Sequence, residues 1–162
     1  MSKDTYVAVV GPSAATPAEH ALGEELGRRI AQAGCVLVCG GMGGLMEAAA
    51  SGCAKAGGRS VGIVPGDRAT ANPYLTVVVA TGMGEARNAI VVRTADVVIA
   101  VTGEFGTLSE IALALKMGTP VVGLQTWELA KPGLDTDPIV RASDPADAVA
   151  TALDLARLAA GR

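Results

Sequence analysis

The segment VVIAVTGEFGTLSE, Val97–Glu110, combines an unbroken apolar run, a glycine-rich turn and the start of a helical pattern. The same order occurs earlier, where the apolar run Cys35–Cys39 leads through Gly40–Gly44 into an alanine-rich segment. A third apolar run, Tyr6–Val10, is closed by a glycine and a proline. Short apolar strands that are each followed by a helix predict β-α-β units and a parallel sheet covered on both faces.

Apolar runs and helical patterns alternate along the whole chain. Strands are expected at Tyr6–Val10, Cys35–Cys39, Ser60–Val64, Leu75–Val79, Val97–Val101 and Val121–Leu124, and helices at Leu45–Ala56, Gly84–Thr94 and Leu108–Met117. Capping patterns predict one further helix after Thr16 and a last one after Asp144. On the last helix, Ala148, Leu153, Leu155 and Leu158 are expected to pack on the sheet, and Trp127–Asp137 is expected to be a loop. We therefore predict an α/β fold of one domain over residues 1–162: a Rossmann-like, doubly wound parallel sheet in three α/β/α layers.

The composition limits the partners that we expect. Half of the 162 residues are apolar but only 2% are aromatic, so the core should consist of Val, Ile, Leu and Ala. The formal net charge is −3 and the basic residues form no stripe, which argues against nucleic-acid binding. The longest uncharged stretch, Ile30–Met46, is broken by five glycines and is too short to span a membrane.

Cysteine and histidine usage argues against a metal site. Cys35, Cys39 and Cys53 show no CxxC spacing, and His20 is the single histidine. We expect the three thiols to be small buried hydrophobic groups in a reduced compartment. Because the N-terminal residues show no signal peptide, a cytoplasmic location is expected.

The glycine turns are the expected ligand site. In parallel sheets ligands bind beyond the carboxyl ends of the strands, where helix N-termini attract anions and glycine lets a phosphate approach the backbone. The sequence has no GxxxxGK[ST] or GxGxxG motif. One such turn alone would be typical of any α/β protein, and Ser13 has the alternative of a simple turn residue, but two glycine-rich turns after apolar strands favour a phosphate. The expected contacts are Gly11, Ser13, Gly40, Gly41, Gly43, Gly44, Met46, Gly103, Gly106 and Thr107.

Three motifs together carry a family resemblance: Gly40-Gly41-x-x-Gly44-Leu45-Met46, then Arg87-Asn88, then Gly103-x-x-Gly106-Thr107-x-x-Glu110. They resemble the Lonely Guy family of cytokinin-activating phosphoribohydrolases, over about Val7 to Leu124. The chain is more similar to a bacterial branch in which Ala-Arg-Asn replaces the family's Arg-Lys pair. That branch is similar to molybdenum-cofactor carrier proteins, which hold a pterin phosphate without consuming it. The resemblance implies that Arg87, Asn88 and Glu110 belong to the site.

Two functions follow from this resemblance. The first is a carrier or sensor that binds a phosphate-bearing nucleotide or a molybdopterin-type cofactor. The alternative is hydrolysis of a nucleoside 5′-monophosphate, with Arg87 and Glu110 as the catalytic pair and no cofactor required. Asn88 replaces the family's lysine and Glu104 replaces a glycine, and both changes favour the carrier. Lysine decarboxylation is not expected, because it needs a Schiff-base lysine and the lysines lie away from the glycine turns.

Glu110 and Arg87 also have structural interpretations. Thr107-Leu108-Ser109-Glu110 matches a capping box, in which Glu110 would bond back to the Thr107 N–H. Arg87 has the alternative of a surface cation near a helix start, a position that the helix dipole disfavours. Finally, Leu108–Met117 is apolar nearly all round, which predicts a homodimer or larger oligomer, as the resemblance also implies.

Overall fold

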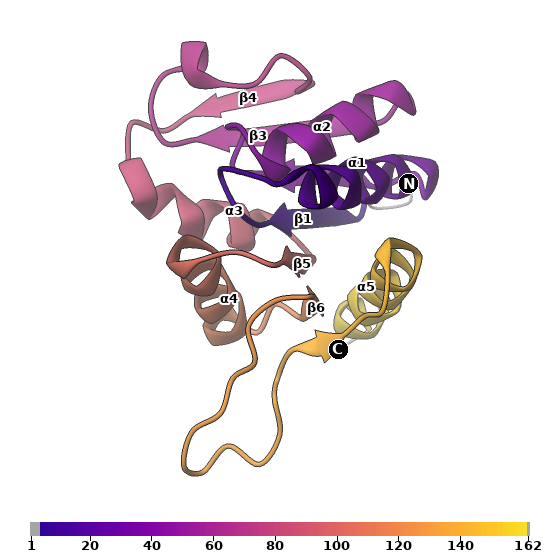
Figure 1. Cartoon of the computed structure of the whole chain (residues 1–162), viewed down its shortest axis with the longest axis vertical. Helices are drawn as coiled ribbons and strands as arrows, with labels where there is room; N and C mark the ends of the chain where they lie inside the picture. Colours follow the sequence, from indigo (N-terminus) through magenta and orange to yellow (C-terminus); the bar gives the residue numbers. More distant parts are fainter. Residues whose placement is uncertain (1–3, 162) are drawn as a thin grey trace.

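Seven parallel strands form one sheet in the computed structural model, which describes residues 4–161 (Figure 1). The strands are β1 (Tyr6–Val10), β2 (Val36–Cys39), β3 (Arg59–Val64), β4 (Val77–Ala80), β5 (Val97–Val101), β6 (Val121–Leu124) and β7 (Val140–Arg141). Their order is β4-β3-β2-β1-β5-β6-β7, so the chain winds outward from β1 in one direction and from β5 in the other. This order confirms the predicted doubly wound, Rossmann-like fold.

Five α-helices of the described part of the chain cover the two faces of the sheet (Figure 1). One face packs against α1 (Pro17–Gln32), α2 (Leu45–Lys55) and α5 (Pro145–Ala160). The other face packs against α3 (Asn88–Thr94) and α4 (Phe105–Met117). Two short 3-10 helices, η1 (Arg68–Thr70) and η2 (Gly84–Arg87), lie in the connections. The result is the predicted three-layer α/β/α arrangement.

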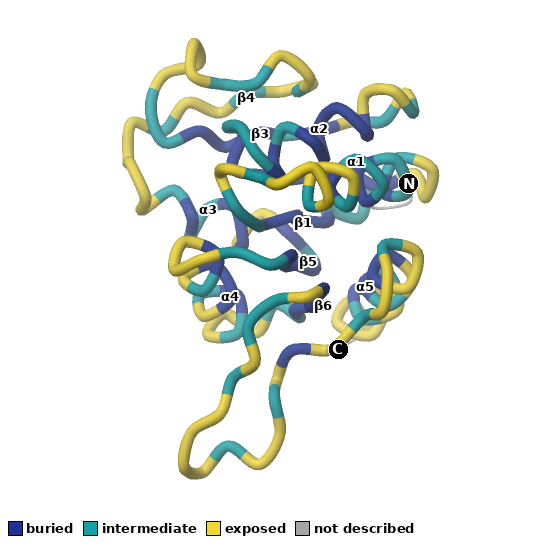
Figure 2. The backbone as a smooth tube through the Cα atoms, in the orientation of Figure 1, coloured by how far each residue is buried: buried dark blue, intermediate teal, exposed yellow. Residues whose placement is uncertain are grey.

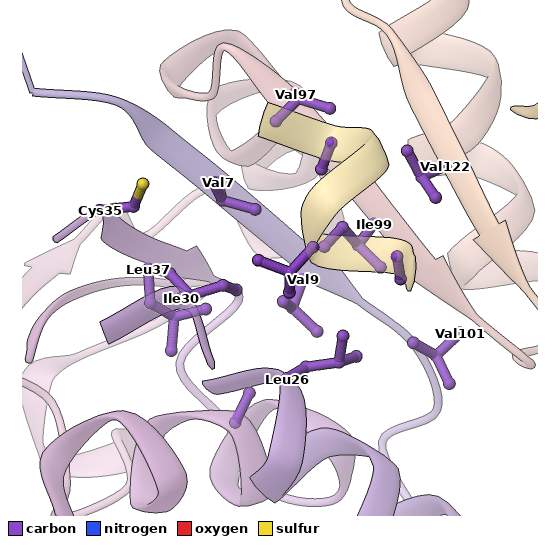
Figure 3. Close-up of a cluster of buried hydrophobic side chains, with 14 of the residues drawn as sticks. Val7, Val9, Leu26, Ile30, Cys35, Leu37, Val97, Ile99, Val101 and Val122 are labelled. Carbon is purple, nitrogen blue, oxygen red and sulfur yellow. The ribbon is translucent and has the colours of Figure 1, made fainter. Parts of the chain in front are cut away.

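Alternate residues of each central strand enter two separate cores. Val7 and Val9 of β1 belong to the core under α1, α2 and α5, which Figure 3 shows, whereas Ala8 and Val10 face α3 and α4. Because both sides of β1 are covered, the whole strand is apolar. The cysteines are buried and free, as expected for small apolar groups.

The predicted capping box at the start of α1 is present and reaches the end of β5. The Glu19 N–H donates to Thr16 Oγ1 at 3.2 Å, and the Thr16 N–H donates to Glu19 Oε2 at 2.8 Å. The second Glu19 oxygen accepts from the Thr102 hydroxyl at 2.7 Å. This bond ties the helix to the residue that follows β5, directly before the third glycine turn.

The fourth strand is displaced from its predicted position. It spans Val77–Ala80 rather than Leu75–Val79 because side chains replace the backbone ladder before it. The Ser60 N–H donates to Thr76 Oγ1 at 3.0 Å, and the Thr76 N–H donates to Ser60 Oγ at 3.1 Å. Backbone pairing with β3 therefore begins only after Thr76.

Three further differences concern the second half of the chain. The helix predicted over Gly84–Thr94 divides into η2 and α3, and β7 was not predicted because two residues show no periodicity. Leu158, expected on the sheet, is 65% exposed. The buried face of α5 consists of Ala148, Val149, Ala152 and Ala156.

The predicted loop Trp127–Asp137 is present and largely exposed to solvent (Figure 2). Among residues 4–161 no helix has the length and hydropathy needed to cross a membrane.

Candidate functional site

A cavity of about 430 Å³ lies where the strand order reverses. It opens at the carboxyl ends of β1, β2 and β5, and residues from all three glycine turns line it. The turns follow neighbouring strands, because β1 lies between β2 and β5 in the sheet. This reversal point is the position at which open α/β sheets bind their ligands.

Most of the sequence-predicted site residues line this cavity. Those that do are Gly11, Ser13, Gly40, Met46, Arg87, Asn88, Gly106, Thr107 and Glu110. The other predicted residues, Gly41, Gly43, Gly44 and Gly103, are not part of its wall. Of these, Gly41, Gly44 and Gly103 have positive φ, of 75°, 66° and 92°, and so shape the turns that carry the lining residues.

The third turn places a helix N-terminus in the cavity wall. Helix α4 begins at Phe105, three residues earlier than predicted, and its N-cap residue Glu104 forms no side-chain cap. The amide groups of Phe105, Gly106 and Thr107 donate no hydrogen bond within residues 4–161. A β carbon at Gly106 would meet no atom within 4 Å, so the space beside this turn is open.

The capping-box interpretation of Glu110 is therefore wrong. Thr107 is the third residue of α4 rather than its cap, and the Glu110 carboxylate does not bond back to its N–H. Three residues apart on one helix, the two side chains lie on the same face, and both residues are buried. Glu110 thus points its carboxylate to the cavity instead of to the helix start.

Arg87 and Glu110 form a buried ion pair at the cavity wall. Arg87 Nη1 lies 3.9 Å from Glu110 Oε1, and the two side chains are only 11% and 9% exposed. Burial excludes the interpretation of Arg87 as a surface cation. Arg87 Nε is the one buried side-chain nitrogen or oxygen in residues 4–161 that has no hydrogen-bond partner. The Glu110 carboxylate accepts no hydrogen bond within the same residues.

Burial controls the ionisation of Glu110. Its pKa is raised from the ordinary value of 4.5 to about 7, because burial disfavours the carboxylate more than the nearby Arg87 guanidinium favours it. An acid with such a pKa exchanges its proton near neutral pH. Beneath the second turn, burial also raises the pKa of the Cys39 thiol to about 12, so that this thiol stays protonated.

Asn88 holds Arg87 in place. Its Oδ1 accepts a hydrogen bond from Arg87 Nη1, and its Nδ2 donates to Ser109 Oγ at 3.4 Å. The Ser109 hydroxyl donates in turn to the Gly106 carbonyl at 2.7 Å. The residue at the position of the family's lysine thus links the arginine to the first turn of α4 and adds no second cation.

Sequence reasoning missed part of the wall. Met42, Pro65 and Glu85 also line the cavity, and no motif marked them. Within the described part of the chain, Arg87 is the one cation that lines the cavity, whereas Glu85, Glu104 and Glu110 all line it. Glu85 and Glu104 are exposed, so solvent screens the charges at the mouth.

The fold and this site define a Rossmann-like protein with a cavity at the reversal point of its sheet. The chain belongs to the SLOG cluster4 family, whose model matches residues 4–149. This match confirms the resemblance to the Lonely Guy-like superfamily. An uncharacterized protein from Archaeoglobus fulgidus is 40% identical over 119 residues, which cover 74% of this chain and 79% of that protein.

Two solved structures extend the comparison. The molybdenum cofactor binding protein from Rippkaea orientalis has a TM-score of 0.87 and 36% identity, over 94% of this chain and 98% of that chain. The Moco carrier protein from Chlamydomonas reinhardtii has a TM-score of 0.85 and 32% identity, over 96% of this chain and 99% of that chain. Both likenesses confirm the predicted similarity to molybdenum-cofactor carrier proteins.

Proposed function

We propose that this protein is a carrier of a phosphate-bearing cofactor of the molybdopterin type. The observation that carries the proposal is the convergence of three glycine turns, an uncapped helix N-terminus and a buried arginine on one cavity of about 430 Å³. Cofactor and small-molecule sites have volumes of this order. The names of the two similar proteins, a molybdenum cofactor binding protein and a Moco carrier protein, support the class of ligand.

The phosphate binds, in this proposal, at the start of α4. The free amides of Phe105, Gly106 and Thr107 offer hydrogen bonds, and the helix dipole adds a partial positive charge. Ser13, in the turn that follows the neighbouring strand β1, lines the same cavity. Glu104 also lines the cavity, but it is exposed, so solvent screens its charge from a bound phosphate.

Asn88 and the acidic wall favour binding over cleavage. Cleavage needs groups that bind the transition state more strongly than the ground state. Among residues 4–161 the cavity wall offers one cation, Arg87, and Asn88 binds that cation instead of supplying another. A carrier needs only the ground-state contacts that the turns and Arg87 provide.

The proposal is tested by removing one hydroxyl from the phosphate cradle. Thr107→Val keeps the shape of a buried side chain, whereas Thr94→Val makes the same change on α3 outside the cavity wall. Cofactor released from a denatured molybdoenzyme is titrated against each protein by calorimetry. We expect Thr107→Val to weaken binding by about tenfold, in line with one lost hydrogen bond to a charged group, and Thr94→Val to bind as the unaltered protein does. Equal affinities of both variants would contradict the phosphate position.

A second candidate function is favoured by the Arg87–Glu110 pair itself. A buried carboxylic acid with a pKa of about 7, 3.9 Å from a guanidinium, is suited to general acid–base catalysis at neutral pH. We therefore keep hydrolysis of a nucleoside 5′-monophosphate as the alternative to carriage.

We also propose that two copies of the chain associate through α4. Phe105 is 75% and Met117 37% exposed, and Ala112 is exposed between them. A helix with uncovered apolar residues at both ends and in its middle is normally covered by a partner.

A further inference from the structure

Two polar groups at the cavity wall lack hydrogen bonds within residues 4–161. Arg87 Nε makes no hydrogen bond, and the Glu110 carboxylate accepts none. The Glu110 side chain is 9% exposed and lines the cavity. Arg87 and Glu110 both line the cavity, so a ligand there can supply hydrogen bonds that their side chains lack, and leaving such groups unpaired is costly.

The chemistry of the pair specifies what the ligand must offer. A guanidinium donates hydrogen bonds and accepts none, whereas a carboxylate has two oxygens that only accept. The closest atoms of the two groups are 3.9 Å apart, so one ring edge can reach both. That edge must carry an acceptor directly beside N–H donors.

We propose that Arg87 and Glu110 recognise the 2-amino-4-oxo edge that pterin and guanine rings share. The ring carbonyl accepts from Arg87, while the adjacent ring N–H and the 2-amino group each donate to one oxygen of Glu110. This inference rests on the proposed function, because it places the heterocycle of the same phosphate-bearing ligand. Arg87 and Glu110 then determine which ring is bound, and the phosphate is bound by other groups.

The position of Arg87 and Glu110 is consistent with separate sites for the ring and the phosphate. Glu110 lies one helical turn beyond Thr107, so a phosphate at the start of α4 and a ring at Glu110 occupy neighbouring parts of one cavity. Met42 and Met46 line the same space, and thioether groups pack well against flat rings. A second anion beside Glu110 would instead be repelled by its carboxylate.

Other purine edges satisfy the pair less well. Adenine has one amino donor beside a ring acceptor, so one Glu110 oxygen stays unpaired. Xanthine places a carbonyl where the 2-amino group would lie, and that carbonyl faces a carboxylate oxygen. Sites that hydrogen-bond a ligand group discriminate strongly against analogues that lack it.

The test is a set of calorimetric titrations of the full chain at pH 8, where Glu110 is ionised. The probes are the 5′-monophosphates of guanosine, adenosine and xanthosine, and 6-hydroxymethylpterin phosphate. We expect the guanosine and pterin compounds to bind at least about tenfold more tightly than the adenosine and xanthosine compounds. Equal affinities for all four would overturn the inference and leave the proposed phosphate site standing. Binding of none would overturn both.

One variant locates the preference at Glu110. Glu110→Gln keeps the shape but turns one oxygen into a donor, so the preference for guanosine monophosphate over adenosine monophosphate should fall to about twofold or less. Glu128→Gln, on the exposed loop after β6, removes the same charge away from the cavity and should keep the preference. A Glu110→Gln protein that still prefers the guanosine compound would overturn the assignment. If this variant does not fold, the ranking of the four probes by the unaltered protein decides alone.

Discussion

Gly40 and Arg87 lie against each other so closely that a β carbon at position 40 would be 2.8 Å from Arg87 Nη2. The same carbon would be 2.6 Å from the sulfur of Met46. The glycine at the end of β2 therefore creates the space in which the arginine is buried. Glycine is therefore required at position 40 because no larger side chain fits there, and not because the backbone needs an unusual conformation.

Gly40→Ala should accordingly displace the Arg87 guanidinium and weaken ligand binding. A displaced or lost charged hydrogen bond corresponds to about 1.5–3 kcal/mol, or roughly a tenfold to hundredfold rise in the Kd measured by calorimetry. Gly66→Ala is the matched control, because a β carbon there meets no atom within 4 Å. If both variants bind equally well, Arg87 is not part of the binding site.

Glu110 should make the stability of the protein depend on pH between about 4.5 and 7. Its pKa is about 7 in the folded chain and 4.5 as its ordinary value, so the folded state holds the proton more tightly. Below pH 4.5 Glu110 is protonated in both the folded and the unfolded chain, so it does not lower the free energy of unfolding. As the pH rises through 7 the folded chain must ionise a buried acid, and the loss reaches about 3 kcal/mol.

The contribution of Glu110 is isolated by comparison with Glu110→Gln. Both proteins are unfolded with urea at a series of pH values from 4.5 to 8. Other carboxylates, such as Glu19 and Asp147, whose pKa is lowered by hydrogen bonds, contribute equally to the free energy of unfolding of both proteins, so their contribution cancels in the difference. We expect the variant to gain stability relative to the parent as the pH rises. A constant difference across this range would show that Glu110 does not titrate near 7.

The exposed apolar residues of α4 predict an oligomer. Light scattering at micromolar concentration should return the mass of a dimer or a larger assembly, which for a dimer is twice the chain mass of 16.1 kDa. Met117→Lys should shift that assembly toward the monomer, because it places a charge on the proposed interface. Leu158→Lys, on the exposed side of α5, should leave it unchanged. A monomer at these concentrations would contradict the proposal.

The hydrolase alternative predicts a different observation. Adenosine monophosphate incubated with the protein at pH 7 should release adenine steadily, and chromatography would detect it. Our account predicts little or no free base. Release that disappears in a folded Glu110→Gln protein would establish the hydrolase.

Three strands of the sheet were predictable to the residue because their apolar runs are sharply bounded at one end. β1, β5 and β6 have the predicted limits, since each is an unbroken apolar run next to glycine, proline or a charged residue. β7 has only two residues and gives no such pattern. The start of β4 depends on the side-chain bonds between Ser60 and Thr76, and these join positions far apart in the sequence.

The sequence predicted nine of the residues that line the cavity, but not their environment. A threonine three residues before a glutamate has the same spacing in a capping box and within an established helix, so the sequence alone left both interpretations of Glu110 open. The burial of Arg87 depends on Gly40, which directly follows β2 and lies far away in the sequence. Pro65 and Glu85 line the cavity only because the fold brings them there, and no sequence motif marks them.

The most direct test of the carrier proposal is to measure how much molybdenum and pterin stay bound to the protein when it is purified from cells that synthesise molybdenum cofactor. Metal analysis and the fluorescence of oxidised pterin should both detect ligand, at a molar ratio that falls by up to about tenfold in Thr107→Val and remains unchanged in Thr94→Val. The bound cofactor should be recovered intact, with its phosphate. Protein that carries neither molybdenum nor pterin under these conditions, or that returns a cleaved ligand, would contradict the account.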